Sequence, residues 1–134
     1  MRLRAFATRK PKTIFKENKP MPMIITKTTT KISKEQERVL TQKFGEAIAL
    51  LPGKSEEWLM LSFEEGARMA FRGKCDSDLC YIEVNLLGAA SREAYDNLTA
   101  RLCEVVSETL GVAPGGIYIK YEEAKTWGYD GFNF

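Results

Sequence analysis

One pattern occurs twice along this chain, and the two copies are separated by 58 residues. Each copy has a short apolar run, a serine that opens a helical stretch, and a second apolar run. Ser33 and Ser91 stand at equivalent places in the two copies, as do Met23 and Tyr81. The chain is therefore predicted to contain two β-α-β units in succession. Each unit should form a right-handed parallel pair of strands with its helix on one face.

Both predicted helices have clear starts and stops. Ser33 and Gln36 form a capping-box pattern, and the helical spacing that follows ends at Pro52-Gly53. Ser91 opens the second helix, which Gly111 closes. Runs rich in Ile, Val, Tyr and Trp predict four strands: Met23–Thr26, Trp58–Phe63, Leu79–Leu86 and Ile117–Tyr121. These elements predict an α/β domain with a four-stranded mixed sheet and two helices on one face.

The uncovered face of this sheet predicts an assembly. The run Trp58–Phe63 scarcely alternates between apolar and polar residues, so both of its faces need to be buried. Two helices cover only one side of a four-stranded sheet. We therefore expect the other face to pack against further copies, which makes the protein an obligate oligomer.

Positive charge is concentrated at the start of the chain. Residues 1–21 hold seven of the 20 Lys and Arg residues and one acidic residue, so this segment carries +6 and the remainder −4. The segment contains Pro11 and Pro20 and has no periodicity, so we expect 1–21 to be a disordered basic extension and 22–134 the folded domain. The remainder of the chain is mildly acidic and has no basic patch of the kind that binds nucleic acid. No run in the sequence approaches the roughly 20 apolar residues that a membrane-spanning helix needs. Neither nucleic acid nor a membrane is expected as a partner.

Cysteine and histidine usage limits the compartment and the chemistry. Three cysteines, without a secretory signal pattern, indicate free thiols in a reducing compartment. We expect a cytoplasmic protein, with export by a non-classical route as the open alternative. The chain has no histidine, which excludes a Ser-His-Asp triad and a His-ligated metal site. Any proton transfer must therefore use another group.

Pro22 is the candidate for that group. A proline at a chain terminus is a secondary amine, whereas an internal proline nitrogen is an amide without basicity. A free α-amino group titrates near about 8, and an apolar pocket with a nearby cation would lower that pKa. Neutral base would then be present at neutral pH for removing a proton next to a carbonyl group. Lys54 follows the first helix, so its ammonium can lie near Pro22, hold a substrate carboxylate and disfavour protonation of the proline.

A set of short stretches resembles one known family in order and spacing. They are Met21-Pro22 before an apolar strand, Pro52-Gly53-Lys54, Met69–Gly73, Val112–Pro114 leading into Ile117–Ile119, and Trp127–Tyr129 with Phe134. Over residues 21–134 the chain resembles the macrophage migration inhibitory factor branch of the tautomerase superfamily. The resemblance implies a homotrimer that needs no metal or organic cofactor. It also implies keto–enol tautomerisation of an aromatic 2-oxo acid such as phenylpyruvate, with dopachrome isomerisation as a companion activity.

The same resemblance implies roles for further residues. It supports Lys54 as the carboxylate anchor, and it assigns the backbone N–H of Leu87 to a substrate oxygen. Tyr118 would line the pocket from a neighbouring subunit, with strand packing as its alternative. Trp58 and Tyr129 match aromatic pocket positions, with core or interface packing as their alternative. The family often has asparagine where this chain has Lys120, so substrate contacts there are expected to differ.

Two questions stay open at this stage. Pro22 becomes a terminal amine if Met21 is the true start and is removed, or if residues 1–21 are a cleaved targeting peptide; a retained extension would block the site. The function also has rivals. One is a cytokine-like protein that acts on a host receptor and keeps its pocket as a vestige, and another is a tautomerase-fold protein acting on a different dicarboxylate or dienol.

Overall fold

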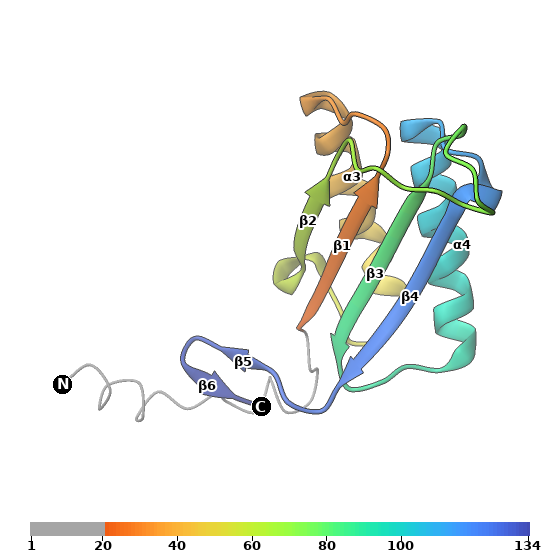
Figure 1. The fold of residues 1–134 in the computed structure, drawn as a ribbon. Helices are drawn as coiled ribbons and strands as arrows, with labels where there is room; N and C mark the ends of the chain where they lie inside the picture. The colour runs from red at the N-terminus through yellow and green to blue at the C-terminus, as the bar shows by residue number, and fades with distance from the viewer. Residues whose placement is uncertain (1–20) are drawn as a thin grey trace.

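A computed structural model describes residues 21–134 of the chain. Its centre is a four-stranded sheet in the order β2-β1-β3-β4 (Figure 1). The strands are β1 (Pro22–Thr28), β2 (Met60–Glu64), β3 (Cys80–Leu87) and β4 (Ile117–Ala124). β1 pairs in parallel with β2, and β3 in parallel with β4, while β1 and β3 are antiparallel neighbours. The predicted four-stranded mixed sheet is confirmed.

Two long helices cover one face of the sheet (Figure 1). They are α3 (Lys34–Ala47), which continues into the 3-10 turn η1 (Ile48–Leu50), and α4 (Arg92–Leu110). The predicted capping box is present, because the Ser33 hydroxyl accepts from the Gln36 N–H while the Gln36 side chain accepts from the Ser33 N–H. Gly111 ends α4 with φ 77°, a conformation that favours glycine.

The 58-residue repeat is confirmed in the fold. β1 and β3 begin 58 residues apart, at Pro22 and Cys80, and the serines that cap the two helices have the same separation. The two units bury one shared core between sheet and helices. Its fully buried members include Ile24, Leu40, Phe44, Ile82, Val84, Leu98 and Leu102.

The prediction of a strand over Trp58–Phe63 is wrong at its start. Glu56–Trp58 forms a 3-10 turn, η2, Leu59 links it to the sheet, and β2 begins only at Met60. A serine followed by acidic residues favours the first turn of a helix, so the chain turns once more before it enters the sheet.

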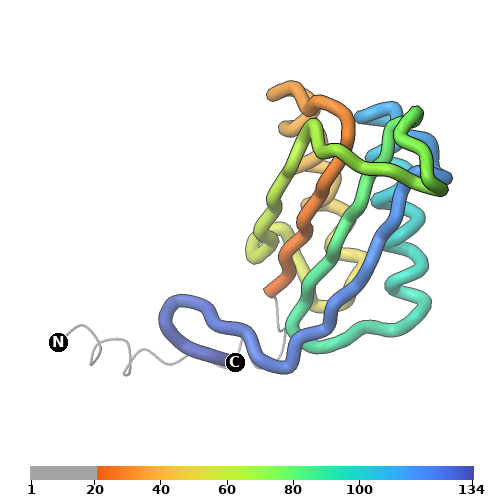
Figure 2. Tube along the Cα trace, viewed as in Figure 1, coloured from red at the N-terminus to blue at the C-terminus, as the bar shows by residue number. Residues whose placement is uncertain are grey.

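A hairpin at the C-terminal end was not predicted. Its strands are β5 (Gly128–Tyr129) and β6 (Phe132–Asn133), and they extend beyond the end of the sheet where β1 begins (Figure 2). Asp130 and Gly131 connect them with φ values of 53° and 85°. Aspartate followed by glycine suits a two-residue hairpin turn with both residues at positive φ.

The second face of the sheet has no covering layer among the described residues. Along β1 and β3, residues that point to the helices are buried, and the alternating residues are half-buried or exposed. Tyr118 on β4 is 63% exposed and Met60 on β2 is 64% exposed. β2 is therefore an edge strand of the single chain, and its predicted burial on both faces depends on the predicted oligomer.

The predicted basic extension falls mostly outside the described residues, which begin at Met21. Met21 itself is buried, with 3% of its surface exposed. The described residues therefore begin one residue before the predicted domain start.

Two threonines on the core face of β1 give a stability test. The buried Thr26 hydroxyl has no hydrogen-bond partner among the described residues, whereas Thr28 donates to the Leu79 carbonyl over 2.9 Å. An unpaired buried hydroxyl is destabilising, so Thr26→Val should raise the free energy of unfolding by about 1 kcal/mol. The matched change Thr28→Val should lower it by about 1–2 kcal/mol. Urea denaturation of both variants measures the two values, and equal signs would contradict this account.

Candidate active site

Pro22 lies where the two β-α-β units meet. It is the first residue of β1, it is buried, and it pairs with Leu86 near the end of antiparallel β3. Proline has no backbone N–H to donate. Because Pro22 is the first residue of β1, no hydrogen bond within the strand ladder is lost. The antiparallel arrangement brings the start of β1 beside the end of β3, which places Leu87 next to the Pro22 position.

Lys54 reaches the same place from the loop after α3. Gly53, with φ 82°, turns the chain just before it. Only 8% of Lys54 is exposed, and its Nζ donates a hydrogen bond to the Leu87 carbonyl over 3.0 Å. Lysine is rarely buried to this degree unless its ammonium is paired. The bond holds the positive charge of Lys54 at Leu87, the residue that follows Leu86, and Leu86 is the residue that pairs with Pro22.

The backbone of Leu87 presents two groups at this end of the sheet. Its carbonyl accepts from Lys54, and its N–H donates to the Met21 carbonyl over 3.3 Å. A cleft of about 490 Å³ opens beside it, a volume within the range of small-molecule sites. The lining residues are Leu87, Gly88, Ala89, Glu123, Ala124 and Lys125.

Trp58 and Tyr129 contact each other at this same end. Their ring centroids are 5.5 Å apart and their planes are nearly perpendicular, an edge-to-face arrangement. The parallel register pairs Met60 with Met23, so η2 and Trp58 lie just beyond the start of β1. Tyr129 comes from the C-terminal hairpin. The structure thus brings together Trp58 and Tyr129, which were predicted from unconnected parts of the sequence.

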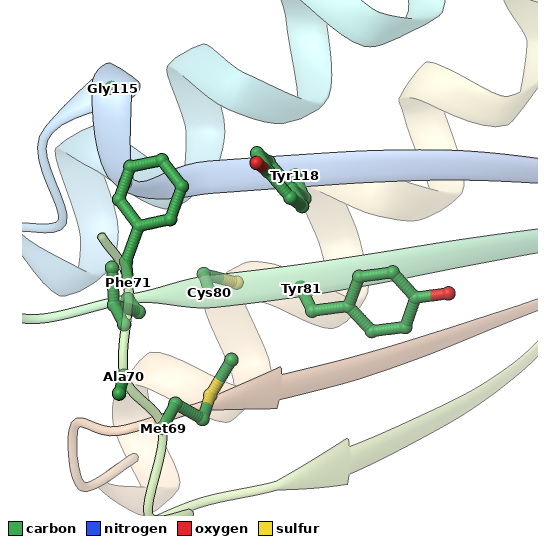
Figure 3. A pocket seen from close by; sticks show the side chains of 9 residues that line it. Met69, Ala70, Phe71, Cys80, Tyr81, Gly115 and Tyr118 are labelled. Carbon is green, nitrogen blue, oxygen red and sulfur yellow. The ribbon is translucent and has the colours of Figure 1, made fainter. Parts of the chain in front are cut away.

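Tyr118 lies at the opposite end of the sheet from Pro22. It pairs with Tyr81, which pairs with Lys27 near the far end of β1. Its ring meets that of Phe71 edge-on, with centroids 5.5 Å apart, over a small pocket of about 90 Å³ (Figure 3). Within one chain Tyr118 does not join the Pro22 group, so only the Tyr118 of another copy can line that site.

Lys120 occupies the open face of the sheet beside acidic residues. Its Nζ lies 3.1 Å from a Glu122 oxygen and 3.9 Å from a Glu83 oxygen. The hydrogen bond to Glu122, with a further one to Tyr81, raises the pKa of Lys120 above its ordinary value. Its charge is therefore shared with two carboxylates of its own chain.

The comparisons with known proteins agree on one family. A sequence model of the macrophage migration inhibitory factor (MIF) family matches residues 21–134. The chain belongs to the MIF family. It is 28% identical over 118 residues to macrophage migration inhibitory factor of Meriones unguiculatus, which covers 85% of this chain and 99% of that protein.

Solved structures share the fold of this MIF-family chain. Leishmania major MIF2 aligns with a TM-score of 0.80 at 23% identity, covering 86% of this chain and 98% of its own. The MIF homologue of Prochlorococcus marinus aligns with a TM-score of 0.74 at 27% identity, covering 84% and 98%. The predicted tautomerase fold is confirmed.

Two features of the site in this MIF-family chain were missed in the sequence. One is the hydrogen bond from the Leu87 N–H to the Met21 carbonyl. A pattern of residue types cannot reveal it, because both groups belong to the backbone. The other is Tyr95, whose hydroxyl accepts from the Ala90 N–H over 3.1 Å and donates to Glu123 on the rim of the cleft. Burial, followed by the bond with Glu123, raises the pKa of Tyr95 to about 12. Tyr95 lies in α4, and nothing in the sequence pattern connected it with the site.

The described residues hold neither a cluster of metal-ligating side chains nor a helix able to cross a membrane. Within 21–134 no three potential ligands of the His, Cys, Asp and Glu types gather into one cluster. Over the same residues, neither long helix combines the length and apolar character that crossing a bilayer needs.

The cysteines of this MIF-family chain are free thiols with different environments. Cys75 is exposed and Cys80 is buried. Burial, and secondarily the nearby Cys103, raises the pKa of Cys80 to about 12 from 9.0. The thiolate is the reactive form, so Cys80 stays protonated and unreactive in the folded protein.

Thiol labelling tests this difference. At pH 8, Ellman's reagent should modify Cys75 rapidly and leave Cys80 untouched until the protein is denatured, with peptide mass spectrometry locating the label. Cys75→Ser should remove the rapid phase. Because the raised pKa keeps the Cys80 proton bound in the folded state, its contribution to stability should be complete below about pH 9 and be lost as the pH rises towards 12. Rapid labelling of Cys80 in the native protein would refute the assignment.

Proposed function

We propose that the protein is a cofactor-free tautomerase that interconverts the keto and enol forms of aromatic 2-oxo acids such as phenylpyruvate. Dopachrome isomerisation is the proposed companion activity. The observation that carries the proposal is the buried Lys54 ammonium, bonded to the Leu87 carbonyl beside the Pro22 position. Membership of the MIF family adds support.

The base in this proposal is Pro22 as a free amino-terminal residue. Its nitrogen has a lone pair only when nothing is acylated onto it. Burial and the Lys54 charge both disfavour the protonated amine, so its pKa falls below the value of about 8 for a free α-amino group. The neutral amine takes a proton from the carbon next to the substrate carbonyl. This leaves an enolate and a protonated Pro22, which then delivers the proton to the enolate oxygen, so that the enol forms and the neutral base is restored. In the reverse direction the amine takes the proton from the enol oxygen and delivers it to the carbon, which gives the keto form.

Lys54 and Leu87 bind the substrate in this scheme. The Lys54 ammonium pairs with the carboxylate of the 2-oxo acid, which orients the acidic carbon towards Pro22. The Leu87 N–H donates to a substrate oxygen, where negative charge grows as the proton leaves. Trp58 and Tyr129 supply aromatic surface for the substrate ring. A chain without histidine can complete this reaction, because every proton passes through one amine.

The proposed active assembly is a homotrimer that completes each site with Tyr118 of a neighbouring copy. Two observations support it: Tyr118 is remote from Pro22 in its own chain, and among residues 21–134 no helix or further strand packs on the face of the sheet opposite the two helices (Figure 1). The closed symmetry of a trimer would bring the Tyr118 end of each sheet to the Pro22 end of the next.

Substitution in the chain that begins at Pro22 tests the catalytic roles. Pro22→Gly should lower kcat for phenylpyruvate tautomerisation by about 100-fold or more, because the prolyl base is lost. Lys54→Ala should lower kcat/KM by roughly 10- to 100-fold, mainly through KM, because the carboxylate loses a charged partner. Ultraviolet absorbance of the enol measures both rates.

Lys34→Ala, at the exposed start of α3, is the matched control for loss of a lysine and should leave the rate unchanged. Equal rates in the wild type and in both site variants would end the catalytic proposal and favour the rival function, an interaction protein with a vestigial pocket.

Mixing two inactive variants tests the shared site. Pro22→Gly and Tyr118→Ala chains, each of low activity, should regain activity when they are unfolded together and refolded. In a random 1:1 mixture about a quarter of all sites, or about one site in each mixed trimer, combine an intact Pro22 with an intact Tyr118 from the neighbour. Native mass spectrometry confirms the mixed trimers. No gain of activity in confirmed mixed trimers would show that each chain builds its site alone.

A further inference from the structure

The contact between Met21 and Leu87 occupies a group that the proposed function needs. The Leu87 N–H, assigned above to a substrate oxygen, donates to the Met21 carbonyl over 3.3 Å. Pro22 pairs with Leu86, so this bond extends the β1–β3 ladder by one further pair. A peptide carbonyl and a substrate carbonyl are the same kind of acceptor, and one N–H cannot serve both fully.

The Met21 side chain also lies inside the protein. Met21 is 3% exposed, and its carbonyl lies on the residue whose own carbonyl holds Lys54. An apolar, flexible side chain therefore occupies space at the Pro22 end of the sheet. Together, the Met21 carbonyl and side chain occupy the hydrogen-bond donor and the space that a bound substrate would use.

We infer that Met21 is an internal plug, which keeps the chain latent by filling the substrate-oxygen position at Leu87 as well as by acylating Pro22. This inference rests on the proposed function, because it takes Leu87 as the oxygen-binding group. Its new content concerns binding. A chain that retains Met21 lacks the base and also excludes the substrate, so removal of Met21 unmasks the amine and the donor in one step.

A ligand that binds without reacting separates binding from catalysis. Phenylglyoxylate is an aromatic 2-oxo acid with no proton on the carbon next to its carbonyl, so it cannot enolise. It should bind the chain that begins at Pro22 at least 10-fold more tightly than the full chain 1–134, by isothermal titration calorimetry. Amino-terminal sequencing confirms each start. The chain that begins with Gly at position 22 is the matched control, and it should bind like the Pro22 chain although its turnover is slow.

Amide hydrogen exchange supplies a readout that needs no ligand. The Leu87 N–H should be protected in the full chain and exchange at least 10-fold faster in the chain that begins at Pro22, while the Val84 N–H within β3 stays protected in both. Phenylglyoxylate should restore protection at Leu87 in the shorter chain.

The outcomes distinguish this inference from the proposed function. Equal binding of phenylglyoxylate by both chains, binding by neither, or equal exchange at Leu87 would each overturn the plug. If the shorter chain binds the ligand and the full chain does not, the plug stands even when phenylpyruvate turnover is absent. The proposed tautomerase activity would then fail alone.

Discussion

The antiparallel pairing of β1 with β3 is the interaction on which the rest of this structure depends. Each β-α-β unit supplies a parallel pair, and neither pair can bury its helix-facing side alone. Pairing the first strands of the two units joins them into one sheet and one core. Because these strands run in opposite directions, the start of one lies beside the end of the other. That geometry places Pro22 beside Leu86 and Leu87.

The same pairing makes the two ends of the sheet chemically different. At one end are the Lys54 ammonium, the backbone of Leu87 and the aromatic pair of Trp58 and Tyr129. At the other end Tyr118 and Phe71 cover a small apolar pocket (Figure 3). The two ends of one chain therefore carry different groups, and a Tyr118 side chain can meet a Pro22 end only if it comes from another copy.

Burial of charge is the electrostatic feature that distinguishes the Pro22 end. Lys120 is bonded to carboxylates on an open face, where solvent screens its charge. Lys54 is almost fully buried, and its ammonium donates to the Leu87 carbonyl at the Pro22 end. A cation in such surroundings acts more strongly on a nearby amine or carboxylate, since the effective dielectric constant is lower.

The sequence by itself determined the two long helices, the four strands of the central sheet and their order along the chain, because these follow from local chemistry. Ser33 and Ser91 cap their helices, Gly111 ends one, and apolar periodicity marks the shared core. The boundaries of β2 were less predictable, because the Ser55–Glu57 turn competes with the apolar run that follows it. The sequence also indicated Pro22 and Lys54, since a chain without histidine leaves few bases.

Only the tertiary structure decided which residues meet. The Lys54–Leu87 bond, the contact of Trp58 with Tyr129 and the remoteness of Tyr118 all depend on strand order and register. A local sequence pattern predicts neither the order of the strands in the sheet nor the register of their pairing, since both depend on how the two β-α-β units pair. The Met21 carbonyl on the Leu87 N–H is the extreme case, because backbone groups are the same in every residue and only the fold determines their partners.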